Sequence, residues 1–262
     1  MSDSVTKPPV DPKQGVDPEL VVAQLAHVDK RFTLHHTHSI KEYLVWTMKG
    51  RKGELSETFL ALHNVNLDIH QGESVALLGF NGSGKSTTLK LLSGVMMPDV
   101  GEVGIRGKVA GLIEVGAGFH PDLTGRENVY LNGAILGMSE AEIDEKFDDI
   151  VAFSEIEKFI DTEVKFYSSG MFLRLAFSVA VHSQPDVFLV DEILTVGDEP
   201  FQRKCIAKIK ELKAAGQTLV VVSHDLQMVS GICDRGVVLA KGELAFDGPV
   251  AEAVDYLRST EG

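Results

Sequence analysis

Residues 79–86 have the types and spacing of a loop that binds a phosphate chain. Their sequence, GFNGSGKS, fits the pattern G-x-x-x-x-G-K-[ST]. Glycines allow turns in which several backbone N–H groups point at one anion, because no Cβ blocks them. The Lys85 ammonium suits the β- and γ-phosphates, and the Ser86 hydroxyl suits Mg²⁺. We therefore expect ATP with Mg²⁺, contacted by Gly79, Asn81, Gly82, Ser83, Gly84, Lys85, Ser86 and Thr87.

Three further polar residues follow two apolar runs. Asp191 and Glu192 come directly after residues 187–190, and His224 follows residues 220–222 closely. Such runs are typical of strands buried on both faces, whose carboxyl ends line the ligand crevice of an open sheet. We expect Asp191 to hold Mg²⁺, Glu192 to polarise an attacking water and His224 to sense the γ-phosphate. A capped, solvated turn is the alternative for the acidic pair, and the upstream phosphate loop disfavours it.

The expected elements place these residues in a sheet protein that contains a helical insertion. A strand over residues 73–79 leads into the loop, and a helix over 85–92 follows it. Capping boxes that begin at Thr124 and Ser139 predict two helix starts, and no strand is expected from 124 to about 166. Other strands are expected at 20–34 (broken near 27–30), 59–69, 101–106, 109–115, 187–190, 218–222 and, as a pair, 235–246. Other helices are expected at 168–182, 199–215, 225–233 and 250–258.

Two N-terminal segments lie outside this pattern. Residues 1–18 hold four prolines among polar residues and are predicted to be a flexible tail. Residues 39–49 predict a short amphipathic helix, which is either a surface insertion or a docking surface for a membrane subunit. The three histidines at 35, 36 and 38 lack a carboxylate or cysteine at ligand spacing, so a metal site is disfavoured there.

Composition excludes several classes of protein. The 262 residues are 44% hydrophobic and 24% charged, which is ordinary for a globular domain. The net charge of −13 disfavours a scaffold that binds nucleic acid through non-specific phosphate contacts. Two cysteines without C-x-x-C spacing disfavour disulfides and zinc, favour a reducing cytoplasm and are expected to be buried. No stretch approaches the roughly 18 apolar residues that cross a bilayer, and no signal peptide is evident.

Residues 167–174, YSSGMFLR, resemble the signature L-S-G-G-Q-x-x-R of ABC-type ATPases. They match it at Ser168 and Gly170 and depart from it at 167, 169 and 171. Ser168 and the N–H groups after it would begin a helix and form a second anion site. The resemblance implies a homodimer in which each ATP lies between the phosphate loop of one chain and Ser168, Ser169 and Gly170 of the other. It also implies that residues 197–198 form the D-loop and that His224 is the switch histidine.

Three segments indicate one particular group within the ABC-type ATPases. Residues 112–128, 167–171 and 190–198 are similar to the cassettes of exporters for O-antigen, capsule, teichoic acid and related envelope polysaccharides. Many O-antigen relatives carry a further carbohydrate-binding β-sandwich, for which this chain has no room. We therefore expect glycan recognition to lie elsewhere.

The resemblance also assigns residues by analogy. Most ABC cassettes have a glutamine near position 114 or 115, and Glu114 is expected to replace it as a magnesium ligand. An aromatic upstream of the phosphate loop is expected to stack on adenine, with Phe32 as the first choice and Phe59 as the second. A groove at residues 119–123 is expected to receive a coupling helix from the membrane subunit.

The expected fold is α/β: a P-loop NTPase of ABC type over residues 19–262, with a mixed core sheet, an antiparallel β part and a helical subdomain at about 124–183. The expected function is that of an ATPase, peripheral at the cytoplasmic face of the membrane, working as a homodimer under two permease copies. It would export a lipid-linked envelope polysaccharide that the permease contacts, without binding nucleic acid. Alternatives are another membrane export system, a soluble ABC ATPase acting on nucleic acid or ribosomes, and a binding module with an inactive site.

Overall fold

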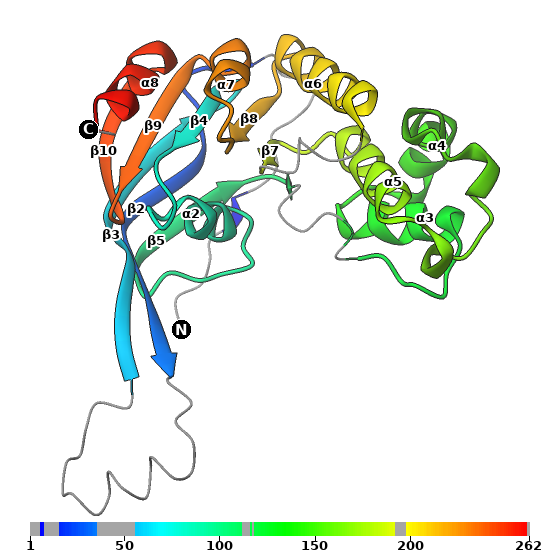
Figure 1. Ribbon diagram of the computed structural model, residues 1–262, viewed down its shortest axis with the longest axis horizontal. Helices are drawn as coiled ribbons and strands as arrows, with labels where there is room; N and C mark the ends of the chain where they lie inside the picture. The colour runs from blue at the N-terminus through cyan, green and yellow to red at the C-terminus, as the bar shows by residue number, and fades with distance from the viewer. Residues whose placement is uncertain are drawn as a thin grey trace, which may run out of the picture.

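The core of the protein is a six-stranded sheet whose strands β4, β7 and β8 are buried on both faces. The computed structural model describes residues 6–7, 16–35, 56–111, 116, 118–191 and 198–260. The strand order is β10-β9-β4-β8-β7-β6 (Figure 1), and β10 alone is antiparallel to its neighbour among these strands. The strands are β4 (Ser74–Leu78), β6 (Val109–Gly111), β7 (Val187–Val190), β8 (Thr218–Val221), β9 (Arg235–Ala240) and β10 (Glu243–Pro249).

Alternation along these strands sends side chains into two separate apolar cores. Ala76 and Leu78 face a core shared with helices α5, α6, α7 and α8, whereas Val75 and Leu77 face α2 and the second sheet. The helices are α2 (Lys85–Leu92), α5 (Ser169–His182), α6 (Glu199–Ala214), α7 (Leu226–Ile232) and α8 (Val250–Ser259). Because β4, β8 and β7 are parallel neighbours, their carboxyl ends lie at one edge of the sheet.

The second sheet is the antiparallel part that the sequence predicts. Its order is β1-β5-β2-β3, with β1 (Thr6–Lys7), β2 (Val21–His35), β3 (Ser56–His70) and β5 (Val100–Arg106). The predicted break in β2 is a set of register shifts around His27, which has a φ of 52°, and the strand continues through it. Within the segment predicted to be a flexible tail, Thr6–Lys7 pairs in parallel with β5.

Helices α3 (Gly125–Ile135), α4 (Glu140–Ser154) and α5 (Ser169–His182) form a group that we call the helical lobe. Figure 1 shows it at the opposite end of the molecule from α8. Both capping boxes are present: Thr124 and Ser139 each accept from the N3 backbone, and Glu127 and Glu142 bond back to them. The lobe has a core of its own, which includes Val129, Ile150, Leu175 and Val179.

Several expectations are confirmed and others lie outside the described residues. Cys205 and Cys233 are buried, and burial raises the pKa of each thiol to about 12. The predicted strand over 109–115 is described only as far as Gly111, and the predicted helix over 39–49 lies outside the described residues. None of the helices in the described part of the chain is long and apolar enough to cross a membrane.

Candidate functional site

The phosphate loop joins β4 to α2 and has a backbone that requires glycine. Gly84, the residue before α2, has a φ of 111°. A Cβ on Gly84 would lie 2.5 Å from Leu62 Cδ2 and 2.9 Å from the Ala61 carbonyl oxygen, so β3 packs directly against the loop. Gly82 also has a positive φ, of 78°, but a Cβ there would meet nothing within 4 Å. The two glycines therefore differ in the room around them.

This difference gives a matched pair of variants. Gly82→Ala adds left-handed strain alone, so we expect it to lower the free energy of unfolding by about 1 kcal/mol. Gly84→Ala adds a collision with β3 as well, so we expect a loss of about 3 kcal/mol and weaker ATP binding. Urea unfolding and titration with a fluorescent ATP analogue measure the two effects. Equal losses for both variants would contradict the packing argument.

Lys85 and the first turn of α2 supply the positive side of the loop. The Lys85 side chain is buried, and its Nζ donates to the carbonyl oxygens of Gly79 (2.7 Å) and Phe80 (3.0 Å). Helix α2 has no side-chain cap, and neither has α8, whereas each of α3 to α7 is capped by Thr124, Ser139, Ser168, Asp198 or Asp225. No cap side chain therefore occupies the first N–H groups of α2, which leaves them available to a phosphate.

The carboxyl edge of the sheet brings the predicted acidic and histidine residues next to the loop. Strand β8, which leads to His224, lies between β4 and β7, and the Val222 N–H bonds to the Val190 oxygen at 2.7 Å. Asp191 is half-buried at the end of β7, and His224 is exposed. Glu192 and Glu114 lie outside the described residues. The strand order therefore brings the segments that carry the phosphate loop, Asp191 and His224 to one edge.

The donor set fits Mg²⁺ bound together with a nucleotide. Ser86 is exposed in the first turn of α2, and Asp191 ends the strand that follows β8 in the sheet. No cluster of three or more histidine, cysteine or carboxylate ligands occurs among the described residues. Mg²⁺ commonly uses one or two protein oxygens and completes its shell with water and phosphate, so Ser86 and Asp191 suffice. Phosphate at the uncapped end of α2 would supply the remaining oxygens.

The signature segment begins α5, in the helical lobe. Ser168 is the N-cap of α5, and its Oγ accepts from the Met171 N–H at 3.2 Å. Ser168 and Ser169 are exposed, whereas Tyr167 is half-buried and donates to the Phe159 oxygen at 2.7 Å. Burial raises the pKa of Tyr167 to about 12, so this phenol stays a donor. The departure from leucine at 167 thus serves to anchor the segment.

Within one chain the signature segment and the phosphate loop belong to separate parts of the molecule. Helix α2 packs against β2, β3 and β5, while α5 packs against α3 and α4. Figure 1 shows α2 beside the sheets and α5 in the helical lobe. The start of α5 and the start of α2 therefore lie apart within one chain.

The two aromatic candidates for adenine are neighbours. Phe32 on β2 and Phe59 on β3 are directly opposite in register, so both rings lie on one face of the antiparallel pair. The Phe59 side chain is 50% exposed, and the Lys30 Nζ lies 5.9 Å from the Phe32 ring centroid. Adenine stacking stays a prediction for each of them.

Sequence reasoning missed an ionic cluster behind the signature segment. Arg174 Nη2 donates to Asp198 Oδ1 and Nη1 donates to Glu155 Oε2, each at 2.7 Å. Arg174 belongs to the signature pattern, but no local spacing identifies its partners, which lie 19 and 24 residues away. The cluster links α5 to Asp198, the N-cap of α6.

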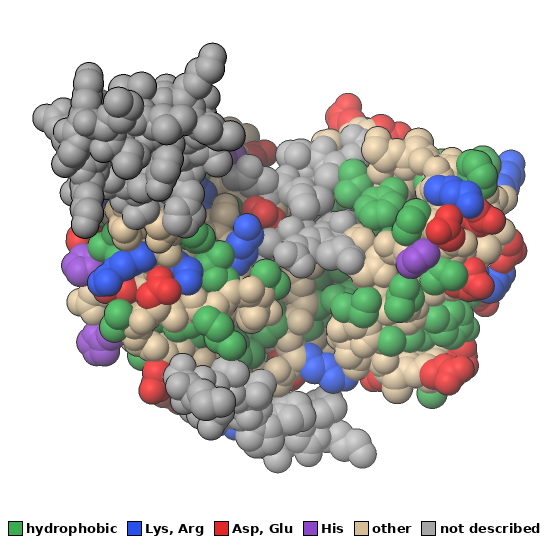
Figure 2. All heavy atoms as spheres, turned by 90° about the horizontal axis from the view of Figure 1, so that it is seen from below, with side chains coloured by type: hydrophobic (Ala, Val, Ile, Leu, Met, Phe, Trp, Pro, Cys, Tyr) green, Lys and Arg blue, Asp and Glu red, His purple; other side chains and the backbone are tan. Residues whose placement is uncertain are grey.

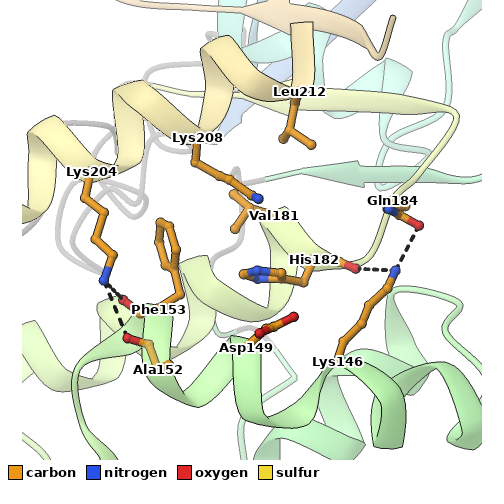
Figure 3. A pocket seen from close by; sticks show the side chains of 10 residues that line it. All are labelled: Lys146, Asp149, Ala152, Phe153, Val181, His182, Gln184, Lys204, Lys208 and Leu212. Atoms are coloured by element: carbon orange, nitrogen blue, oxygen red, sulfur yellow. Dashed lines mark hydrogen bonds between the residues drawn. The ribbon is translucent and has the colours of Figure 1, made fainter. Parts of the chain in front are cut away.

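A cavity of about 610 Å³ lies beside this cluster, between α4, α5 and α6 (Figure 3). Its lysines are bonded within the chain: Lys146 Nζ donates to the His182 oxygen at 3.0 Å and Lys204 Nζ to the Phe153 oxygen at 2.9 Å. Burial is the largest cause of the lowered pKa values of Lys146 and His182. These lysines stabilise helix carboxyl ends, where cations are favourable.

Comparisons with known proteins agree with this geometry. Residues 62–195 match the family described as ABC transporter. The chain is 40% identical, over 90% of its length and 97% of the relative's, to the O-antigen export system ATP-binding protein RfbB of Klebsiella pneumoniae. It is 42% identical to the teichoic acids export ATP-binding protein TagH of Listeria innocua, covering 86% of this chain and 66% of that protein.

A solved structure shows the same fold in a dimer. It is a dimeric ATP-binding cassette in a post-hydrolysis state, bound to ADP and Pi. The TM-score is 0.68 at 27% identity, and the alignment covers 87% of this chain and 99% of that one.

Proposed function

The chain belongs to the ABC transporter family, and from that premise we propose that it is the ATP-hydrolysing subunit of an exporter for a lipid-linked cell-envelope polysaccharide. The observation that carries the proposal is that the phosphate loop at the start of α2 and the signature segment at the start of α5 lie on separate parts of one chain. The near full-length similarity to an O-antigen export protein supports the polysaccharide as cargo. The ATPase activity follows from the family.

The proposed active unit is a head-to-tail homodimer. The exposed Ser168 and Ser169 of one molecule would meet the γ-phosphate held at the phosphate loop of the other. Each ATP is then sequestered between two chains, and its binding closes the dimer. A dimeric cassette with bound ADP and Pi has the same fold, which supports this arrangement.

Within each site the residues have separate roles. Lys85 and the first turn of α2 bind the β- and γ-phosphates, while Ser86 and Asp191 hold Mg²⁺, with Glu114 proposed as a further ligand. The metal neutralises charge that develops on the phosphate oxygens when it is bound. Glu192 polarises the attacking water, and His224 contacts the γ-phosphate from the end of the strand between β4 and β7. Phe32 or Phe59 stacks on adenine.

The helical lobe is the proposed contact for a membrane permease present in two copies. Phe119 packs edge-to-face on Phe172 of α5, with ring centroids 5.0 Å apart. On α3, Leu131 and Ile135 are 37% and 60% exposed, and Figure 2 shows hydrophobic side chains across this end of the molecule. Exposed apolar side chains that gather on one surface favour a protein partner. The chain then works at the cytoplasmic face of the membrane.

Deletion of the gene in its native cell tests the proposed function. We expect loss of the envelope polysaccharide from the cell surface and accumulation of its lipid-linked form inside. Wild-type chain should restore export and hold an integral-membrane protein through purification, while Ile135→Asp should do neither. Met97→Asp, at a residue that is 58% exposed outside the helical lobe, is the matched control and should behave as wild type. Unchanged surface polysaccharide after deletion would refute the proposal.

A further inference from the structure

Glu155, the residue that ends α4, has a backbone conformation that disfavours glutamate. Its φ is 59° and its ψ is 34°, in the left-handed region. Helices that end in this region usually place glycine or asparagine there, because a Cβ strains the conformation. Strained positions persist where another requirement overrides local stability, and they cluster at functional sites. The question is therefore which contacts of the Glu155 side chain require a glutamate at this strained position.

The Glu155 carboxylate bridges two cations from different helices. Its Oε2 accepts from Arg174 Nη1 on α5 at 2.7 Å, and its Oε1 accepts from Lys204 Nζ on α6 at 3.0 Å. The hydrogen bond from Lys204 is the largest cause of its lowered pKa, and Arg174 adds to the effect. One carboxylate thus ties the end of α4 to both neighbouring helices.

Arg174 carries the connection onward to the start of α6. Its Nη2 donates to Asp198 Oδ1 at 2.7 Å, and the same Asp198 oxygen caps α6 by accepting from the Phe201 N–H at 3.3 Å. The guanidinium also lies 4.6 Å from the Phe201 ring centroid, and the Arg174 side chain is only 18% exposed. A guanidinium held on two sides by carboxylates has one orientation, which fixes α5 relative to α6.

Lys204 holds α4 without help from Glu155. Its Nζ donates to the Phe153 oxygen at 2.9 Å and lies 4.7 Å from the Phe153 ring centroid. Figure 3 shows Lys204 reaching from α6 to the backbone of α4. Attachment of α4 to α6 therefore has its own contacts. The hydrogen bond between α4 and Arg174 Nη1, by contrast, is made by the Glu155 carboxylate.

We propose that Glu155 is a positioning residue for ATP hydrolysis, which acts by orienting Arg174 between the end of α4 and Asp198. Ser168 begins the helix that carries Arg174, and Asp198 begins α6, so Arg174 sets the spacing of these two segments. The inference rests on the proposed function, in which Ser168 and Ser169 of one chain meet the ATP of its partner. Glu155 itself touches neither ATP nor Mg²⁺ in this scheme.

Glu155→Gly separates positioning from stability. Glycine suits the left-handed conformation, so the thermal midpoint of this variant should equal or exceed that of wild type. The Mg-ATP turnover number of the full-length chain should fall about tenfold, with KM for ATP unchanged, because the signature segment is misplaced. A residue with a structural role alone would lose stability and turnover together. Wild-type turnover in Glu155→Gly would overturn the inference.

A double variant tests whether Glu155 acts through Arg174. Glu155→Gln combined with Arg174→Gln should turn over no more slowly than Arg174→Gln alone, whereas additive losses would overturn the inference. Glu157→Gln is the matched control, because Glu157 is exposed two residues further along and makes no ion pair to another described residue. It should keep wild-type turnover. If the wild-type chain itself had no turnover, the proposed function would be overturned. If only the Glu155 variants behaved as wild type, the inference about Glu155 alone would be overturned.

Discussion

A Glu192→Gln chain binds ATP with wild-type affinity but hydrolyses it about 10² to 10⁴ times more slowly. Glutamine keeps the size of the side chain and removes the carboxylate that polarises the attacking water. The substitution leaves Lys85, the phosphate loop and the first turn of α2 unchanged, so the nucleotide still binds. The ATP-bound dimer should therefore accumulate, since the step that separates the two chains is blocked.

Single-turnover hydrolysis, nucleotide titration and size-exclusion chromatography with Mg-ATP measure these three effects. Glu211→Gln, at an exposed glutamate near the carboxyl end of α6, is the control and should turn over as wild type. If Glu192→Gln retained wild-type turnover, the catalytic assignment of Glu192 would be wrong.

Ser168→Arg should abolish hydrolysis although the phosphate loop of the same chain stays folded and binds ATP. The larger cation replaces the cap of α5 and fills the space that the partner's γ-phosphate requires. We expect turnover to fall by at least about 10²-fold, as for other misplaced or missing oxyanion donors. Ser139→Arg is the matched control: it removes an equivalent cap from α4, costs about 1 kcal/mol of stability, and should leave turnover intact.

Mixing two inactive variants tests whether the site is shared between chains. A Lys85→Ala chain has an intact signature segment, and a Ser168→Arg chain has an intact phosphate loop. In a mixed head-to-tail dimer, one site therefore combines the intact parts. Turnover at equal mixing should recover to about a quarter of wild type, because half of the dimers are mixed and each holds one intact site. No recovery would show that both parts act within one chain.

Local pattern predicted those features in which neighbouring residues determine the outcome. The strand, loop and helix at residues 73–92 follow from an apolar run, glycines and helical spacing, and the structure places β4 and α2 there. The capping boxes at Thr124 and Ser139 fixed two helix starts to the residue. The family and its similarity to polysaccharide exporters are confirmed by the relatives. The roles of Glu192, His224 and the other site residues stay predictions.

Non-local contacts are what the sequence did not predict. The position of β8 between β4 and β7 depends on sheet order, which no single segment specifies. The pairing of Thr6–Lys7 with β5 joins residues about one hundred positions apart. The polar composition of the tail gives no local signal for this pairing. Glu155 is polar and ends a helix, which is unremarkable in sequence; its backbone strain and its two cations appear only when α5 and α6 are in place.

The two bonds that Lys85 makes to its own loop bear on which anions the loop accepts. An incoming phosphate competes with the carbonyl oxygens of Gly79 and Phe80 for the ammonium. A small anion such as inorganic phosphate offers few contacts in exchange, whereas a triphosphate also engages the N–H groups of α2 and a metal ion. We therefore expect the loop to favour a ligand that makes many contacts at once. Free phosphate in the cell would then be a poor competitor of ATP.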